Sequence, residues 1–290
     1  MSGERKKKQR RAVTALLIVL LVASCCVFVW SGYTIVERMR EYGASRDEYA
    51  QLRSQFRSTA APVNGAPEPS AGAAQAADTP EAASGTSAPA GANDVPAPAV
   101  TRELAPAIDF SNLKAENPDT VGWIEIPDTD ISYPVVQAKD NDEYLTHSFS
   151  GDKNSSGAIF LDAESQSDLM GMHTIIYGHH MRDGSMFAQL VKFKDADFFA
   201  AHDEIVLYTP ERTLRLTVIA AYAQKADNAL RQFHFADAEE LSGFIQERAA
   251  LSANGREGVD LSQATRLYSF VTCSYEASDV RTVVHAVELP

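Results

Sequence analysis

The sequence predicts a mostly β domain over residues 108–290, organised as a barrel or a sandwich. Eight short apolar runs rich in β-branched and aromatic residues fill this region, and turn residues such as Pro127-Asp128 separate most of them. The region has 183 residues, enough to bury one hydrophobic core. The expected strands are Val121–Ile126, Ile131–Val136, Ala158–Leu161, His173–Tyr177, Ile205–Tyr208, Leu214–Ala220, Arg266–Val271 and Thr282–Val287.

One helix is expected between the sixth and seventh of these strands. Asp237 precedes an apolar stripe of helical period, and Glu240 three residues later completes a capping box. Asn254-Gly255 supplies a stop signal, so the helix is expected to end there. The stripe consists of Leu241, Phe244, Ile245 and Ala249.

The first forty residues predict a membrane anchor. A basic cluster within residues 1–11 precedes Ala12–Val36, which is 25 positions without a charged side chain. A spanning helix needs about 20 apolar residues, and basic flanks stay on the cytoplasmic side. The N-terminus is therefore expected inside and the rest of the chain outside. A cleaved signal peptide is the competing interpretation, but Ser24-Cys25-Cys26 does not resemble its usual cleavage site.

Two regions separate the expected anchor from the β domain. Residues 37–57 place Tyr49, Leu52 and Phe56 at helical spacing, which predicts a juxtamembrane helix. Residues 58–107 are rich in Ala, Pro, Gly and Ser, so they cannot bury enough surface to fold. They are expected to form a disordered tether that gives the β domain reach from the membrane.

Charge is distributed unevenly along the chain. Residues 1–57 carry 11 Lys/Arg and 5 Asp/Glu, whereas residues 101–290 carry 15 Lys/Arg and 30 Asp/Glu. An acidic outer domain repels phosphate backbones, which argues against nucleic-acid binding. The basic N-terminus suits an anionic inner leaflet.

Cys273 is the only cysteine outside the apolar run that holds Cys25 and Cys26, so it has no ordinary disulfide partner. A lone thiol on an exported domain is exposed to oxidation, and its presence favours a catalytic nucleophile. The alternative is a buried small hydrophobe, and the cysteine alone does not decide between the two.

Histidines are the candidate bases for such a nucleophile. His179 and His180 follow the expected strand His173–Tyr177, and neighbours on an extended chain point to opposite faces. Only one of them is therefore expected to enter a given site, which also argues against a metal held by the pair. No other cluster has zinc-ligand spacing, and no calcium loop of recognised spacing is present. The remaining histidines are interpreted as structural or solvent-facing: His147, His173, His202, His234 and His285.

Arg281 is the candidate oxyanion-binding group. It follows Cys273 by eight residues, so a short connection between strands would bring its guanidinium beside the thiol. A surface salt bridge with Asp279 or Glu276 is the alternative, and such pairs are common. Spacing alone leaves both interpretations open.

Three motifs stand in a fixed order along the chain: Tyr177–Met181 with Asp183–Phe187, Thr272–Glu276, and Arg281 followed by Thr282–His285. They resemble the motifs of the sortases, specifically class B. The order His, Thr-Cys, Arg is specific to that family, and Gly-His-x-Met with a helix before the cysteine strand points to class B. The resemblance runs from about Asn117 to Leu289. It implies a closed, sortase-type β-barrel of about eight strands, with an N-terminal helix and an extra helix before the cysteine strand.

The resemblance also implies residue roles by matching position. His179 is the catalytic histidine, Cys273 the nucleophile and Arg281 the essential arginine, whereas His180 falls on a variable position. The backbone N–H of Ser274 would help Arg281 to hold the carbonyl oxygen. Thr272 either packs within its strand or shapes the substrate site, and both remain open. No cofactor is implied.

The function implied by the resemblance is that of a membrane-anchored transpeptidase of the Gram-positive cell surface. It would cleave a secreted protein's C-terminal sorting signal after Thr, and transfer that protein to a peptidoglycan amine. Class B relatives favour signals of the Asn-Pro-x-Thr type. A pilin-polymerising sortase or a hydrolytic thiol protease would share the first chemical step. A non-catalytic surface binding module is the alternative of another class, and the presence of all three catalytic residues argues against it.

Overall fold

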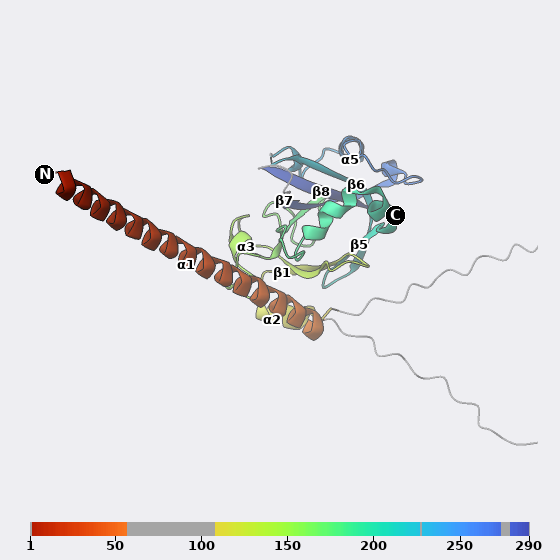
Figure 1. Cartoon of the computed structure of the whole chain (residues 1–290). Helices are drawn as coiled ribbons and strands as arrows, with labels where there is room; N and C mark the ends of the chain where they lie inside the picture. The colour runs from red at the N-terminus through yellow and green to blue at the C-terminus, as the bar shows by residue number, and fades with distance from the viewer. Residues whose placement is uncertain (1, 57–107, 227, 274–278, 290) are drawn as a thin grey trace, which may run out of the picture. The chain divides into compact units, whose positions relative to one another are not determined.

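The computed structural model describes residues 2–56, 108–226, 228–273 and 279–289, and its β domain is a closed barrel of eight strands (Figure 1). Around the barrel the strands follow the order β1-β2-β3-β4-β7-β8-β6-β5. All eight expected strands are present, so the prediction of a mostly β domain is confirmed. Because the strands form a closed sheet, the domain is a barrel and not a sandwich. The strands are β1 Thr120–Glu125, β2 Ser132–Val136, β3 Ile159–Leu161, β4 His173–Tyr177, β5 Glu204–Tyr208, β6 Thr213–Lys225, β7 Arg266–Cys273 and β8 Val280–Glu288.

Two parallel strand pairs, β2 with β3 and β4 with β7, interrupt an otherwise antiparallel barrel. A parallel pair requires a crossover connection, so the chain between β4 and β7 carries most of the helical segments. The shorter helices were not predicted one by one, because segments of three to seven residues are too short to show a helical period. They are α2 Phe110–Glu116, α3 Glu143–Thr146, α4 Ala196–Ala201 and the 3₁₀ segments η1 Ala188–Lys194, η2 Asn228–Leu230 and η3 Leu261–Gln263.

The expected helix before β7 is α5, Ala238–Ala249. The predicted cap is present, since the Asp237 carboxylate accepts from the Glu240 N–H at 2.9 Å. The return bond of the capping box is shifted by one residue, because the Glu240 carboxylate accepts from the Ala236 N–H at 2.6 Å. The helix ends before Asn254-Gly255, so the predicted stop position is wrong. The hydroxyl of Ser252 both accepts from and donates to the backbone of Ala221 in β6, which draws the chain off the helix axis.

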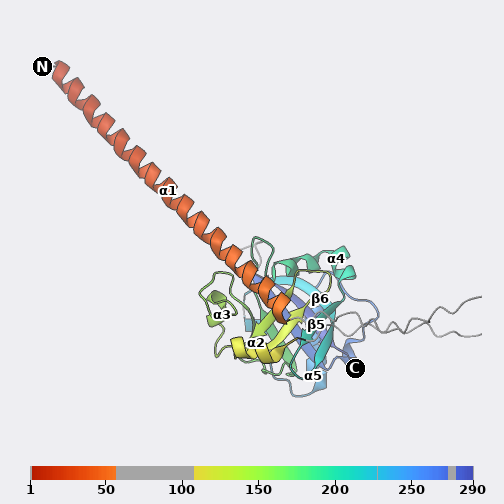
Figure 2. The ribbon, with the colours of Figure 1, turned by 90° about the horizontal axis from the view of Figure 1, so that it is seen from below.

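The helix α1, Ser2–Phe56, unites the expected anchor and the juxtamembrane helix. It contains a stretch long and apolar enough to cross a membrane, and no part of that stretch is buried. At its C-terminal end Tyr49, Leu52 and Phe56 are each at most 3% exposed, which confirms the helical spacing predicted for them. The Tyr49 hydroxyl donates to the Gly157 carbonyl at 2.9 Å, so this end of α1 packs on the barrel domain (Figure 2).

The expected tether, residues 58–107, lies outside the described residues, but the residues that flank it are in contact. The Asp109 N–H donates to the Phe56 carbonyl at 3.0 Å. Tyr49 lies roughly 13 residues beyond Val36, which corresponds to about 20 Å of helix. The separation of the barrel from the apolar stretch therefore follows from α1. The reach expected from residues 58–107 stays a prediction.

Two buried histidines, His173 and His285, belong to one hydrogen-bonded chain on the face of the barrel that α5 covers. The Nδ1 of His173 donates to the Gln232 carbonyl at 2.8 Å, so its Nε2 accepts from the Ser269 hydroxyl at 2.7 Å. The Nδ1 of His285 then donates to Ser269 at 2.8 Å, and its Nε2 accepts from the Tyr222 hydroxyl at 2.9 Å. Every ring nitrogen has a partner, which agrees with the structural role expected for both residues.

Burial keeps both imidazoles neutral and makes the stability of the fold sensitive to acid. Burial lowers the pKa of His173 to about 4 and holds the pKa of His285 well below its ordinary value. The unfolded chain binds these protons below about pH 6.5, and the folded chain does not until a lower pH. Stability is therefore fully present above pH 6.5 and is lost as the pH falls toward 4, by up to about 1.4 kcal/mol per pH unit for each histidine.

We expect urea unfolding of the full chain in detergent to show this loss between pH 6.5 and pH 4. The variant His285→Gln should weaken the slope, because one of the two buried imidazoles is gone. His234→Gln, at an exposed position, should leave the slope unchanged. A wild-type stability that stays level down to pH 4.5 would contradict the expectation.

Candidate active site

The strands β7 and β8 bring two of the predicted site residues together. Cys273 ends β7, and the antiparallel register pairs it directly with Arg281 of β8. Directly opposed positions of an antiparallel pair share one face of the sheet, with Cβ atoms about 5 Å apart. The predicted nucleophile and the predicted oxyanion-binding residue are therefore cross-strand neighbours. Ser274, the third predicted group here, lies outside the described residues.

The end of β4 brings His179 to the same region. β4 runs parallel to β7 with Tyr177 opposite Val271, and the Gly178 N–H donates to the Val271 carbonyl at 3.1 Å. The chain therefore leaves β4 beside the end of β7, and His179 comes next. The His179 Nε2 donates to the Leu145 carbonyl at 2.7 Å, which assigns the ring proton to that nitrogen, since a carbonyl only accepts.

Gly178 is required at the turn before His179. A Cβ at this position would lie 2.4 Å from the Cδ1 of Ile159 and 2.8 Å from the ring of Phe187. Both atoms belong to buried core side chains, so neither can move away without disturbing the packing. The glycine therefore lets the chain pass close to the core and sets the direction in which His179 leaves the strand.

The predicted site residues whose side chains the structure describes line one pocket of about 290 Å³. His179, Thr272 and Arg281 line it, together with Tyr177 and Arg231. Its volume lies at the lower end of the range of small-ligand sites, about 300–1,000 Å³. An imidazole and a guanidinium therefore open on one cavity beside the end of β7. For Cys273 the register of β7 fixes the backbone position only.

Arg281 does not form the salt bridge with Asp279 that was its alternative interpretation. Its Nη1 donates to the backbone carbonyl of Val280 at 3.4 Å, and it makes no ion pair within the described part of the chain. Glu276, the other proposed partner, lies outside the described residues. Because Asp279 does not pair with Arg281, the charge of this guanidinium is available to a ligand in the pocket.

Thr272 is buried in β7 and lines the pocket of about 290 Å³. It is 2% exposed, and its hydroxyl has no hydrogen-bond partner among the described residues. Its cross-strand neighbour Thr282 is equally buried and unpaired within the same ranges. The two threonines pack against each other as β-branched residues of a strand pair. Thr272 also forms part of the pocket wall.

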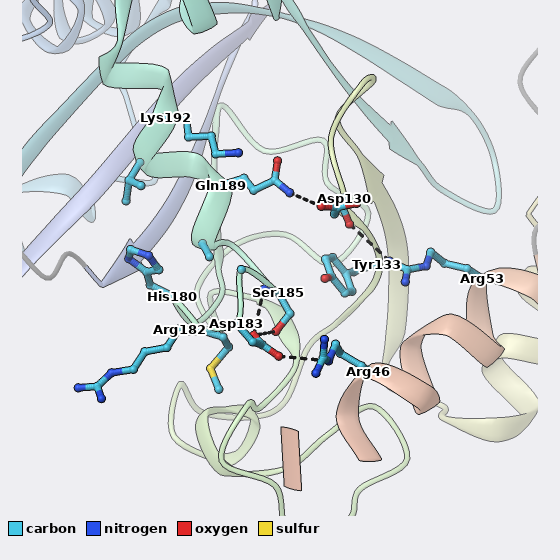
Figure 3. A pocket seen from close by; sticks show the side chains of 14 residues that line it. Arg46, Arg53, Asp130, Tyr133, His180, Arg182, Asp183, Ser185, Gln189 and Lys192 are labelled. Carbon is cyan, nitrogen blue, oxygen red and sulfur yellow. Dashed lines mark hydrogen bonds and ion pairs between the residues drawn. The ribbon is translucent and has the colours of Figure 1, made fainter. Parts of the chain in front are cut away.

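His180 opens on a different pocket, of about 740 Å³ (Figure 3). Arg46 and Arg53 of α1 line this second pocket from the other side, and Arg46 pairs with Asp183 at 3.4 Å. The adjacent histidines thus line separate cavities, as the alternation of an extended chain predicts. His179 is the one that shares a pocket with Arg281.

Asp162 organises the smaller pocket, a role that the sequence analysis did not assign to it. It is fully buried at the end of β3 and connects three walls of the smaller pocket. The Asn141 amide, the Tyr177 hydroxyl and the Arg231 guanidinium all donate to its carboxylate, at 2.8–3.1 Å. An acidic residue that directly closes an apolar strand, as in Phe160-Leu161-Asp162, is the signal that could have revealed it.

The electrostatics of the Asp162 cluster keep its carboxylate ionised. Burial raises the pKa of this carboxyl, but hydrogen bonds from Arg231, the Glu164 N–H and Tyr177 outweigh burial and lower the pKa overall. Burial, followed by the charge of Asp162, raises the pKa of Tyr177, so this phenol stays protonated and donates. The cluster is therefore a fixed ion pair with a neutral hydroxyl.

In sequence and in structure this chain is similar to sortases, and in particular to sortase B proteins. The Sortase domain family matches residues 124–289. Sortase B of Listeria monocytogenes is 34% identical over 168 residues, which span 58% of this chain and 68% of that protein. The X-ray structure of Clostridium perfringens sortase B superposes with a TM-score of 0.59 at 36% identity, over 62% of this chain and 99% of that one. A Staphylococcus aureus sortase B–substrate complex superposes at 0.57 with 28% identity, over 61% and 83%.

Proposed function

Because this chain belongs to the sortases, and within them to class B, it is a cysteine transpeptidase, and we propose that it anchors secreted proteins to peptidoglycan. The observation that carries the proposal is the pairing of Cys273 with Arg281 across β7 and β8. His179, at the adjoining end of β4, lines the same pocket as Arg281. A nucleophile, a proton carrier and an oxyanion donor are the three groups that acyl transfer through a covalent intermediate requires.

In the proposed first half-reaction the Cys273 thiolate attacks the carbonyl carbon of the Thr in a sorting signal. The carbonyl oxygen gains negative charge, and the Arg281 guanidinium stabilises it together with the backbone N–H of Ser274. The C–N bond then breaks, the His179 imidazolium gives its proton to the leaving amine, and a thioester remains on Cys273. A free cysteine has a pKa of about 8.5, so a neighbouring cation such as Arg281 or the imidazolium favours the thiolate.

In the proposed second half-reaction an amino group of a peptidoglycan precursor attacks the thioester carbonyl. His179 accepts the proton that the amine loses, and the C–S bond breaks. The products are a new amide and the Cys273 thiolate beside a protonated His179, so the starting state is restored. Thr272 forms the wall of the pocket in both steps, and no group other than these residues is needed.

The same proposal places the enzyme at the plasma membrane. Residues 1–11 remain in the cytoplasm, residues 12–36 of α1 span the bilayer, and the juxtamembrane helix 37–57 holds the catalytic domain 108–290 outside. The basic N-terminus and the charge-free stretch of α1 support this orientation. Partners are then secreted proteins with C-terminal sorting signals and a peptidoglycan amine. That a sortase B of Staphylococcus aureus was solved with substrate supports a peptide-binding role.

Mass spectrometry of the full chain in detergent tests the proposed function. The chain is mixed with a panel of sorting-signal peptides, including Asn-Pro-x-Thr types, and with triglycine as the amine. The expected product is a peptide cut after Thr and joined to triglycine. Release of free acid alone would indicate a hydrolytic thiol protease, and transfer only to a lysine side chain would indicate a pilin polymerase. No product with any peptide would contradict the proposed function.

The two neighbouring histidines provide a matched pair of variants. We expect His179→Ala to lower kcat/KM by about 10²–10⁴-fold, the usual contribution of general acid–base catalysis. His180→Ala should stay within about threefold of the wild type, because a residue that lines a different pocket makes no contact in the transition state. Peptide-cleavage kinetics on both variants measure the difference, and the reverse ranking would mean that His180 is the catalytic histidine.

A further inference from the structure

Arg231, in the connection between β6 and α5, is held rigidly beside the proposed catalytic pocket. Its Nε donates to the Oδ2 of Asp162 at 2.9 Å, and its Nη2 donates to the Oδ1 at 3.0 Å. The Nη2 also reaches the Glu164 carboxylate at 2.7 Å. A bidentate bond to a fully buried carboxylate fixes both the position and the plane of a guanidinium.

The guanidinium has two donors left over on its Nη1. Arginine carries five N–H donors, and the bonds to Asp162 and Glu164 use the one on Nε and the two on Nη2. Within the described ranges Nη1 has no hydrogen-bond partner. The side chain of Arg231 is 27% exposed and lines the pocket that contains His179, so the guanidinium is open to a ligand there.

Arg231 also lies where two cavities meet. It lines the pocket of about 290 Å³ that contains His179, and an adjoining pocket of about 220 Å³ that extends toward Lys225. Arg281 lines both cavities as well. A peptide bound with its scissile carbonyl at Arg281 would therefore extend past Arg231, several ångströms from the reacting bond.

The local charge decides what kind of acceptor suits this position. Asp162 and Glu164 already place two negative charges on one guanidinium, and the cluster of three residues carries a net charge of −1. A further carboxylate would be repelled, whereas a neutral amide oxygen would not. We infer that Arg231 is a substrate-binding residue whose Nη1 donates to an amide carbonyl oxygen of the bound sorting-signal peptide, outside the scissile bond. This inference rests on the proposed function.

The variant Arg231→Lys tests the inference. Lysine keeps the positive charge beside Asp162 but has no second nitrogen to present toward the pocket. A contact made equally in the ground state and the transition state affects KM alone, so we expect KM for the peptide to rise about tenfold and kcat to stay within about twofold. Arg215→Lys is the matched control, because Arg215 also binds one carboxylate with two hydrogen bonds, to Glu204, and lines neither pocket.

Changes in the peptide substrate identify which carbonyl oxygen accepts the hydrogen bond from Arg231. They also distinguish a binding role of Arg231 from a purely structural one. Each amide of the peptide is replaced in turn by an ester, whose carbonyl is a weaker acceptor. One position should raise KM with the wild type but not with Arg231→Lys, which is the signature of a coupled pair in a double-mutant cycle. If Arg231→Lys does not fold, the double variant Arg231→Gln/Asp162→Asn removes both charges together and is used in its place.

The outcomes separate this inference from the proposed function. Wild-type turnover with unchanged KM in the Arg231 variant, or a lower melting temperature without coupling to any ester, would assign Arg231 a structural role and overturn the inference alone. A wild type that processes no peptide would contradict the proposed function and the inference together. A rise in KM with coupling to one ester position would support both.

Discussion

The variant Cys273→Ala is expected to abolish turnover while it leaves the fold intact. Without a thiolate no thioester can form, and loss of a nucleophile in a covalent mechanism commonly costs about 10⁶-fold in kcat. The change removes one sulfur at the end of β7, so the strand pairing with β8 is retained. Mass spectrometry of the peptide reaction with triglycine should show neither transfer product nor free acid.

The two other cysteines of the chain supply the control. Cys25 and Cys26 are exposed on the apolar stretch of α1, and Cys25→Ala/Cys26→Ala should retain full activity. In that background a thiol-alkylating reagent has one target, so inactivation should follow the gain of a single adduct. Cleavage that continues at the wild-type rate in Cys273→Ala would support the alternative interpretation of Cys273 as a buried small hydrophobic residue.

The variant Arg281→Lys is expected to lower kcat by about 100-fold or more, the usual consequence of losing one oxyanion donor. Lysine preserves the charge opposite Cys273 but loses the planar arrangement of donors. The loss should fall on kcat, because the oxyanion exists only in the transition state and the tetrahedral intermediate. This separates Arg281 from Arg231, whose substitution should change KM.

Steady-state kinetics on Arg281→Lys, with Arg215→Lys as a surface control, measure this expectation. The melting temperature of both variants should match the wild type, since Arg281 forms no ion pair among the described residues. Near-normal kcat in Arg281→Lys would favour a role in charge balance alone. A parallel fall in melting temperature and activity would point to a structural contribution from the end of β8.

Local patterns were sufficient to predict the strands of the barrel. Each apolar run bounded by turn residues corresponds to a strand, and the capping box at Asp237 corresponds to the start of α5. Such signals are reliable because they depend on neighbours within a few residues. The end of α5 was wrong for the converse reason, since Ser252 bonds to Ala221, 31 residues away in sequence.

The candidate site was predictable in part. The roles predicted for His179, Cys273 and Arg281 came from the resemblance of their motifs to those of the sortases, because the spacing of these residues alone left the alternatives open. The Asp162–Arg231 pair could not be predicted, because its members are 69 residues apart and no local pattern connects them. A buried ion pair becomes visible only when the fold brings both partners together.

The sequence by itself determined the β-rich domain, the apolar N-terminal helix and the residue types available for chemistry, because periodicity, length and residue type are local properties. Only the tertiary structure decided which groups meet. It paired Cys273 with Arg281 across β7 and β8, separated His179 from His180 into two pockets, and docked Tyr49 on Gly157, 108 residues away. The physical reason is that a hydrophobic pattern states which face of an element is buried, while strand register and packing against distant elements decide what that face contacts.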